Sequence, residues 1–230
     1  MEWLGPSEWQ AVALSLRVSL VATIASLPLG FFVAFALARW RFPGHALLNA
    51  LVHLPLIMPP VVTGYLLLLA LGTRGPVGGF LADFGIVFAF HWTGAALAAA
   101  IMAFPLLVRA IRLSIEAIDP RLEDAASTLG ASKFWSFLTI TLPLSLPGII
   151  AGMVLAFAKA MGEFGATITF VANIPGQTQT LPSAIYAFLQ IPGQEGAALR
   201  LVTVSIVIAL GAVLVSEWVS RKLANRMRAS

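Results

Sequence analysis

Long apolar runs separated by short polar segments make up most of this chain. A helix needs about 20 predominantly apolar residues to cross a bilayer, so each long run predicts a membrane-spanning helix. Five runs follow one another, at about Ala11 to Ala38, Leu47 to Leu71, Trp92 to Val108, from near Pro147, and Ala197 to Val219. The first is far longer than the apolar region of a cleaved signal, and we expect it to be retained. The pattern predicts an all-α integral membrane protein with five transmembrane helices, built as one domain over residues 1–230.

The second apolar run has an unusual density of helix breakers for a segment that faces lipid. Pro55, Pro59, Pro60 and Gly64 all fall within it, and His53 lies beside them. Each proline removes a backbone hydrogen bond, and the freed carbonyl needs a partner that hydrocarbon cannot supply. We therefore expect this segment to be packed in protein or to line a wet cavity.

The fourth run has a small residue at every fourth position. The row comprises Gly148, Gly152, Ala156 and Ala160. Small residues at this spacing let another helix approach closely, so we favour a packing role for this face over a moving wall of a pathway.

The stretch from Asp119 to Pro143 is too polar to cross a bilayer, and it lies between the third and fourth runs. Asp119 can cap a helix that begins at Pro120, and Gly130 is placed to end it. Glu123 and Asp124 lie near the positive end of this helix. One face carries small and apolar side chains, at Leu122, Ala125, Ala126 and Leu129. Such a shallow stripe suits close docking by another protein, although a helix that only rests on the interface is an alternative.

Composition and charge agree with a membrane location. Of the 230 residues, 59% are hydrophobic and 10% are charged, and the mean hydropathy is +0.93. A net charge of +4 could indicate a nucleic-acid partner in a soluble protein. Here the positive-inside rule explains it better, so we expect no nucleic-acid partner.

The cations also predict the orientation of the spans. Only Arg74 and Arg200 lie in or beside the segments on the other side. Ten cations lie on the side that we assign to the cytoplasm: Arg39, Arg41, Arg109, Arg112, Arg121, Lys133, Arg221, Lys222, Arg226 and Arg228. The N-terminus is therefore expected outside and the C-terminus in the cytoplasm.

Two charged residues lie within the fourth run, where an isolated charge is costly. Lys159 and Glu163 are one helical turn apart and can partly neutralise each other. Charges at this depth are usually functional or paired, and we consider both possibilities.

The polar stretch resembles the cytoplasmic loop signature of ABC importer permeases. The matching residues are Asp124-Ala125-Ala126, then Gly130, Ile140 and Leu142-Pro143. Asp124 stands where the family usually has Glu, so the carboxylate is retained but shortened. The resemblance implies the type I ABC importer permease fold, with a cytoplasmic coupling helix in residues 119–143 that docks on an ATPase subunit. It implies coupling roles for Leu122, Glu123, Asp124, Ala125, Ala126, Leu129 and Gly130.

A second segment is similar to molybdate permeases, and less closely to sulfate permeases. It runs from Lys159 to Gly176 and reads KAMGEFGATITFVANIPG, and HLPLIMPPVVTGYLLL in the second run extends the resemblance. A tetrahedral dianion would need neutral donors and at most a balanced cation, because a deep unpaired cation would trap it. Our candidates for the translocation pathway are Lys159, Glu163, Thr167, Thr169 and Asn173. The neutral ones could instead make ordinary hydrogen bonds between helices.

No catalytic or cofactor motif emerges from the sequence. There are no cysteines, the three histidines are scattered, and neither a zinc-protease motif nor a Walker A pattern occurs. We therefore expect no catalytic residues, no metal site and no cofactor. Energy for transport would have to come from another subunit.

The resemblances favour the transmembrane subunit of an ATP-driven importer for molybdate, and for tungstate as a further cargo. They imply a homodimer in the inner cell membrane, surrounded by lipid, with two ATP-binding subunits and an external oxyanion-binding protein. A sulfate or thiosulfate permease is the first alternative. An ion-driven secondary transporter fits less well because five spans cannot form a balanced inverted repeat. A membrane enzyme is disfavoured by the lack of a site.

Overall fold

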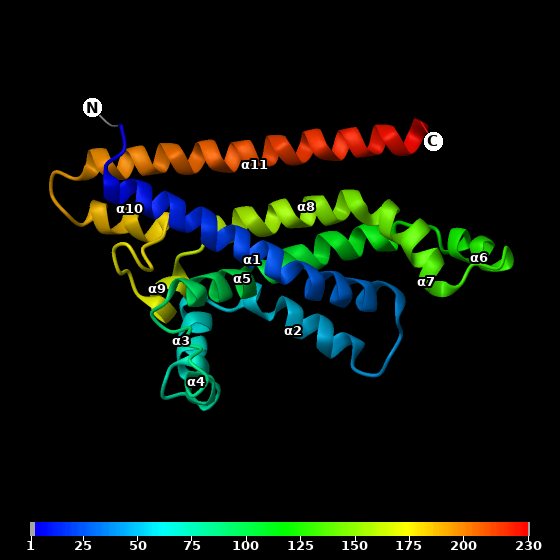
Figure 1. Ribbon diagram of the computed structural model, residues 1–230, viewed down its shortest axis with the longest axis horizontal. Helices are drawn as coiled ribbons and strands as arrows, with labels where there is room; N and C mark the ends of the chain where they lie inside the picture. The colour runs from blue at the N-terminus through cyan, green and yellow to red at the C-terminus, as the bar shows by residue number, and fades with distance from the viewer. Residues whose placement is uncertain (1–2, 230) are drawn as a thin grey trace.

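The computed structural model describes residues 3–229, and all the regular structure in this range is helical. The elements in chain order are α1 (Pro6–Arg39), α2 (His45–Ile57), α3 (Pro60–Leu71), α4 (Pro76–Ala82), α5 (Trp92–Glu116), α6 (Pro120–Thr128), α7 (Lys133–Ser136), the π-helical turn η1 (Phe137–Thr141), α8 (Leu142–Met161), α9 (Gly165–Val171), α10 (Leu181–Leu189) and α11 (Glu195–Ala229). Figure 1 shows α1, α5, α8 and α11 side by side along the long axis, with α6 at the end opposite the N-terminus.

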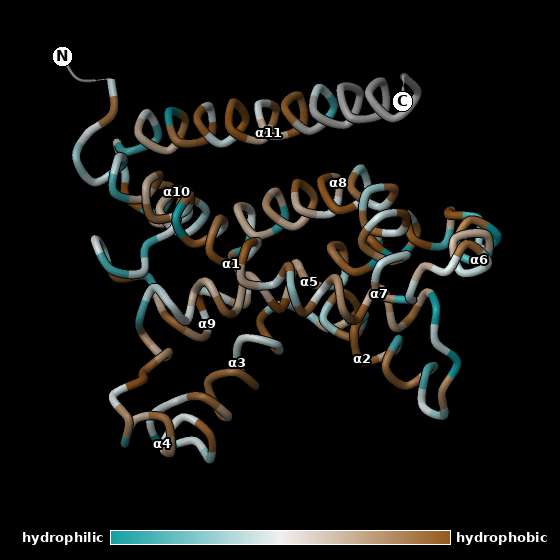
Figure 2. The backbone as a smooth tube through the Cα atoms, turned by 45° about the vertical axis from the view of Figure 1, so that its right-hand side comes forward, coloured by the Kyte–Doolittle hydropathy of each residue, from teal (hydrophilic) through white to brown (hydrophobic). Residues whose placement is uncertain are grey.

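Within residues 3–229, four helical segments are long and apolar enough to cross a membrane. They are α1, α5, the continuous segment Lys133–Met161, and Glu195–Val215 of α11. The pair α2 and α3 supplies a fifth if it is counted as one broken span. In Figure 2, hydrophilic colour gathers at α6 and at the connection between α1 and α2, beyond the ends of the apolar helices. This arrangement agrees with the five expected spans.

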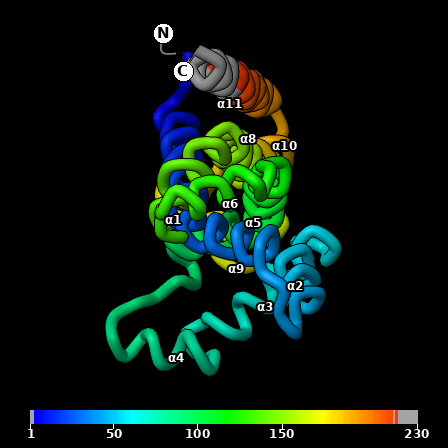
Figure 3. Tube along the Cα trace, turned by 90° about the vertical axis from the view of Figure 1, so that its right-hand side faces the viewer, coloured from blue at the N-terminus to red at the C-terminus, as the bar shows by residue number. Residues whose placement is uncertain are grey.

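The second span is broken rather than straight. The axes of α2 and α3 differ by 112°, and Met58 between them is extended. Pro59 and Pro60 cause the break because neither has an N–H to continue the ladder of α2, and Pro60 instead opens α3. Figure 3 shows α3 and α4 projecting from the bundle. Within this chain the expected packing in protein is met only in part, because the buried residues of α2 and α3 are Val52, Thr63 and Gly64.

The fourth span begins earlier than near Pro147. A helical path runs without interruption from Lys133 to Met161, and its π turn accommodates Pro143. At that turn the amide of Leu142 donates to the carbonyl of Phe137, five residues back. The second half of the polar stretch therefore forms the first turns of a span, and only its first half is a separate helix.

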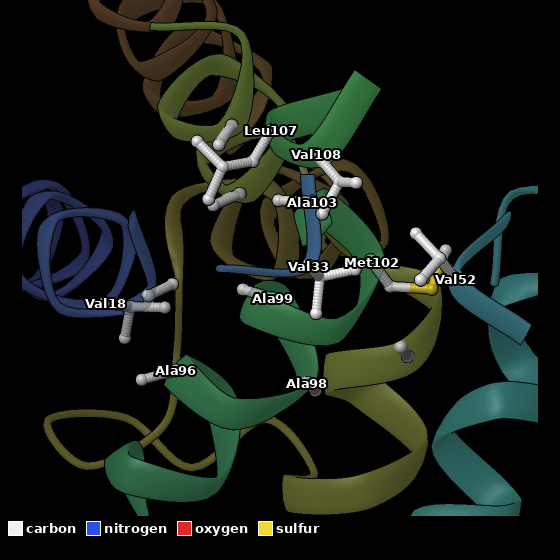
Figure 4. Packing of buried hydrophobic residues seen from close by; sticks show 14 of the residues in the cluster. Val18, Val33, Val52, Ala96, Ala98, Ala99, Met102, Ala103, Leu107 and Val108 are labelled. Atoms are coloured by element: carbon white, nitrogen blue, oxygen red, sulfur yellow. The ribbon is translucent and has the colours of Figure 1, made fainter. Parts of the chain in front are cut away.

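The core is centred on α5, which is rich in alanine and packs against α1 and α8. Figure 4 shows Val18 and Val33 of α1 and Val52 of α2 around Ala99, Met102 and Val108 of α5. Small side chains let helix backbones approach closely, and the resulting van der Waals contacts help to hold helices together inside a membrane.

The row of small residues on α8 is part of this packing. A Cβ added to Gly148 would lie 2.1 Å from Cβ of Ser114, and one added to Gly152 would lie 3.1 Å from the carbonyl oxygen of Leu107. Both neighbours belong to α5. The expected packing role of this row is confirmed.

Candidate functional site

The helix predicted in the polar stretch is α6, and its two ends form as expected. The Asp119 carboxylate accepts the backbone N–H of Arg121 at 2.9 Å, which caps the first turn. Gly130 has φ +89°, a left-handed conformation that glycine adopts without the steric cost of a Cβ. Local sequence signals therefore set both ends of α6.

The predicted coupling residues do not all share one face. Leu129 is 88% exposed, and Leu122, Asp124, Ala125 and Gly130 are also exposed, while Ala126 is half-buried. This leaves a shallow, largely uncharged face open to a partner. The Glu123 side chain instead points toward Arg39 of α1 and Thr141 of η1.

The Glu123 carboxylate joins α6 to the rest of the bundle. Its Oε1 accepts a hydrogen bond from Nη2 of Arg39 at 3.1 Å and from the hydroxyl of Thr141 at 2.6 Å. Arg39 also donates to the carbonyl of Ile118 at 3.3 Å. The resemblance implies a coupling role for Glu123 without placing it on the small and apolar face, and the structure turns its carboxylate toward Arg39, which offers it an ion pair. We call Arg39, Glu123 and Thr141 the coupling joint.

Sequence reasoning missed the coupling joint. Arg39 ends α1 and Thr141 ends the π turn η1. The joint therefore links three elements: α1, α6 and the start of the α8 segment. The only available signal was that these residues fall on the same side of the membrane.

The charged pair at the other end of α8 is present. Nζ of Lys159 lies 2.7 Å from Oε2 of Glu163, and the Glu163 side chain is only 2% exposed against 29% for Lys159. The expectation that both residues lie within the fourth span is wrong for Glu163, because α8 ends at Met161 and Glu163 lies in the break before α9. The break has a physical cause: Oε1 of Glu163 accepts the N–H of Ala166 at 3.0 Å and so caps α9.

The neutral pathway candidates beyond the break have different environments. The Thr167 hydroxyl donates to the carbonyl of Phe164 at 2.9 Å, and that of Thr169 to Gly165 at 2.9 Å. Each hydroxyl hydrogen is thus used inside α9, which is the ordinary structural role. Oδ1 of Asn173 is buried and has no hydrogen-bond partner. Among the three, Asn173 alone retains an unused polar atom in the interior.

The broken span packs directly on this second break. A Cβ on Gly64 of α3 would come within 2.4 Å of the carbonyl oxygen of Ala166, so only glycine allows this crossing of α3 and α9. Nearby, the hydroxyl of Thr63 is buried without a partner. The helix breakers of the second run signalled an irregular segment, but the sequence did not show that it would pack on Gly165 and Ala166. Two helix breaks and one half-buried ion pair therefore share one region.

Nothing in these two regions is arranged for covalent chemistry. In residues 3–229 no group of three or more His, Cys, Asp or Glu side chains is placed to hold a metal ion. The geometry offers an exposed helix with a shallow face, a polar joint behind it, and a charged pair at a break in a span. These features suit binding of a partner and movement of helices relative to one another.

Comparisons with known proteins identify the family. Residues 26–229 match the family described as "Binding-protein-dependent transport system inner membrane component". The molybdenum transport system permease protein ModB of Escherichia coli (strain K12) is 60% identical over 215 residues, covering 93% of this chain and 94% of that protein. The ModB protein of Haemophilus influenzae is 54% identical, covering 96% of each. The sulfate transport system permease protein CysT of Salmonella typhimurium is 38% identical, covering 80% of this chain and 67% of its own length.

Solved structures share the fold at low sequence identity. A bacterial ABC transporter involved in the import of alginate matches with a TM-score of 0.75 and 20% identity, covering 95% of this chain and 80% of that one. The methionine transporter MetNI in an inward-facing conformation matches with a TM-score of 0.68 and 13% identity, covering 94% of each chain. Together with the family match, these likenesses show that the chain belongs to the inner membrane components of binding-protein-dependent transport systems, with the ABC importer permease fold.

Proposed function

We propose that this chain is the transmembrane subunit of an ATP-driven importer that carries molybdate across the inner membrane, with tungstate as a further cargo. The observation that carries the proposal is the 60% identity to the Escherichia coli molybdenum permease along nearly the whole of both chains. An ion-driven transporter and a membrane enzyme lose support, because the family is one of binding-protein-dependent transport components.

The docking partner that we propose for α6 is a separate ATP-binding subunit. The exposed face around Leu122, Ala125 and Leu129 supports this, since an apolar side chain as exposed as Leu129 gains by burial in a partner's cleft. Two permease chains would pair with two ATP-binding subunits and receive cargo from an external binding protein. The exposed, apolar α3 supplies surface for contact between the two permease chains.

The proposed orientation places the N-terminus outside and the C-terminus in the cytoplasm. In this orientation α6 and the coupling joint face the cytoplasm, where ATP-binding subunits would reach them. The charged pair lies at the far end of α8, nearer the outside.

The proposed mechanism is alternating access driven through the coupling joint. Closure of the ATP-binding subunits would pull on α6. The Glu123 contacts would pass that pull to Arg39 on α1 and to Thr141 at the start of α8. At the other end, Lys159 would attract the oxyanion while Glu163 balances its charge, so that the anion is not trapped. Asn173, with its unused polar atom, is the neutral candidate that we favour most.

Uptake of radioactive molybdate tests this function. A bacterium whose own molybdenum permease is deleted should regain uptake when this chain is produced with its ATP-binding subunit and binding protein. A tenfold excess of sulfate should leave molybdate uptake largely intact if molybdate is the cargo. Uptake of sulfate in preference to molybdate would replace our assignment by the sulfate permease, whose Salmonella relative is 38% identical.

A further inference from the structure

An apolar crevice of about 480 Å³ lies between α1, α2 and α5. Side chains of all three helices line it, among them Leu29, Val33, Leu51, Val52, Leu97 and Phe104. Leu29 and Leu51 are among the exposed large apolar residues, so the crevice opens to the outside of this chain. Its floor is the core, since Val33 and Val52 belong to the buried cluster.

A second cavity, of about 430 Å³, lies at the cytoplasmic ends of the same three helices and is basic. The charged and ionisable groups in its lining are Arg39, Arg41, His45, Arg112 and Glu116. Arg39 is paired with Glu123, and Arg112 with Glu116. Arg41 forms no ion pair in the part of the chain that the structure describes. The cavity therefore retains a net positive charge.

Hydrogen bonding leaves one donor of this basic cavity unused. Nε of Arg39 is buried and has no hydrogen-bond partner, although the same guanidinium is engaged through Nη2. Arg112 is held in place by Asn49, whose Oδ1 accepts from Nη1 at 2.9 Å. A fixed arginine, an unpaired arginine and an unused donor together suit a phosphate group, which accepts several charge-assisted hydrogen bonds.

The crevice and the basic cavity follow the same helix faces. Val33 of the crevice and Leu37 of the basic cavity are four residues apart on α1, and Phe104 and Arg112 are two turns apart on α5. Along α1 the two sites extend from Ala25 to Arg39, roughly 21 Å at 1.5 Å per residue. One leaflet of hydrocarbon is about 15 Å thick. The combined site thus spans one leaflet and ends in positive charge where headgroups lie.

We propose that the crevice and the basic cavity together bind one anionic phospholipid of the cytoplasmic leaflet. An acyl chain lies in the crevice, and the phosphate is held by Arg41 and Arg112. Basic pockets between helices on the cytoplasmic side are known recognition sites for anionic headgroups. A free inorganic anion would fill only the basic cavity and leave the crevice empty of apolar contacts. The proposal concerns a lipid, and it stands apart from the identity of the transported cargo.

Lipid retention by the purified complex of permease and ATP-binding subunits tests the proposal. The complex is exchanged into equal amounts of dioleoylphosphatidylglycerol and dioleoylphosphatidylcholine, and the lipid that remains bound per permease chain is measured by mass spectrometry. We expect phosphatidylglycerol to be retained preferentially. Arg41→Gln and Arg112→Gln should each lower this preference about fivefold. Lys133→Gln, which removes an exposed cation on the same side but outside the cavity, should leave it unchanged.

A second variant tests the crevice by itself. Ala25 is exposed at its edge, so Ala25→Phe should fill the crevice without disturbing the core and should reduce retention of both lipids. Assembly with the ATP-binding subunits, measured by size-exclusion chromatography, shows that each variant is folded.

Three results would overturn the proposal. The first is equal retention of the two lipids by the unaltered complex. The second is complete displacement of the lipid by millimolar inorganic phosphate, which would leave only an anion site. The third is a disulfide between two copies carrying Leu51→Cys, which is readily interpreted because the chain has no cysteine of its own. Such a disulfide would place a second permease chain, and not a lipid, in the crevice.

Discussion

The stability lost on breaking the ion pair of Lys159 and Glu163 should depend on which of the two residues is replaced. The Glu163 side chain is almost fully buried, whereas Lys159 is partly exposed. Replacing Lys159 by Met therefore leaves a buried carboxylate that keeps a hydrogen bond from the Ala166 N–H but has lost its counter-charge. Breaking a buried pair in this way costs about 3–5 kcal/mol, and the partial exposure of the site points to the lower end, about 3 kcal/mol. Replacing Glu163 by Gln keeps an acceptor for Ala166 and leaves a lysine that water can reach, for about 1–2 kcal/mol.

The double variant Lys159→Met/Glu163→Gln removes both charges. We expect it to be more stable than Lys159→Met alone, with a coupling free energy of about 1–3 kcal/mol between the two positions. The measurement is the free energy of unfolding of the purified complex, from denaturant titrations of the parent, both single variants and the double. Independent, additive losses would refute the pairing argument. Molybdate uptake per assembled complex, measured on the same set, tests the pathway role, which normal uptake by the double variant would exclude.

Three further predictions concern the coupling region and the orientation. Glu123→Gln weakens the coupling joint, so ATP-binding subunits should still bind while uptake per hydrolysed ATP falls severalfold. Asp124→Asn alters an exposed carboxylate and should instead change the affinity for those subunits, and identical effects of the two variants would contradict their different environments. Gly130→Val should destabilise the turn after α6 by about 1–2 kcal/mol, because a β-branched residue is strained at a φ of +89°. Stimulation of ATP hydrolysis should then fall while membrane insertion persists, and full stimulation would count against docking at α6. A reporter enzyme joined to the C-terminal end should be active only in the cytoplasm and one inserted near Gly176 only outside, and the reverse pattern would invert the topology.

Features of this fold that depend on neighbouring residues could be predicted from the sequence. The ends of α6 follow from Asp119 and Gly130, whose preferences act within a few residues. The contact between Lys159 and Glu163 was predicted from their spacing of four residues, and it forms although Glu163 lies just beyond the end of α8. The apolar runs indicated the spans because a chain inside the bilayer must pair its backbone N–H and C=O groups internally, which a helix does.

Features that depend on distant residues were not accessible in this way. Arg39 and Glu123 are 84 residues apart, and nothing local to either indicates the other as its partner. The prolines of the second run signalled a break, but the 112° bend also depends on packing of α3 against α9. Glu123 was assigned a coupling role together with its helix, and only the tertiary structure shows that its carboxylate binds Arg39 and Thr141.

The position of α8 between the two candidate regions constrains how they can communicate. Gly148 and Gly152 bring its middle into backbone contact with α5, so this part cannot bend without losing close packing. Its two ends are different: the π turn η1 precedes it, and the break at Glu163 follows it. In the proposed mechanism, a pull applied at Thr141 therefore moves α8 and α5 together as one body. The resulting displacement must be taken up at the break, where Gly64 of α3 lies against Ala166, and this is where we expect the pathway to open and close.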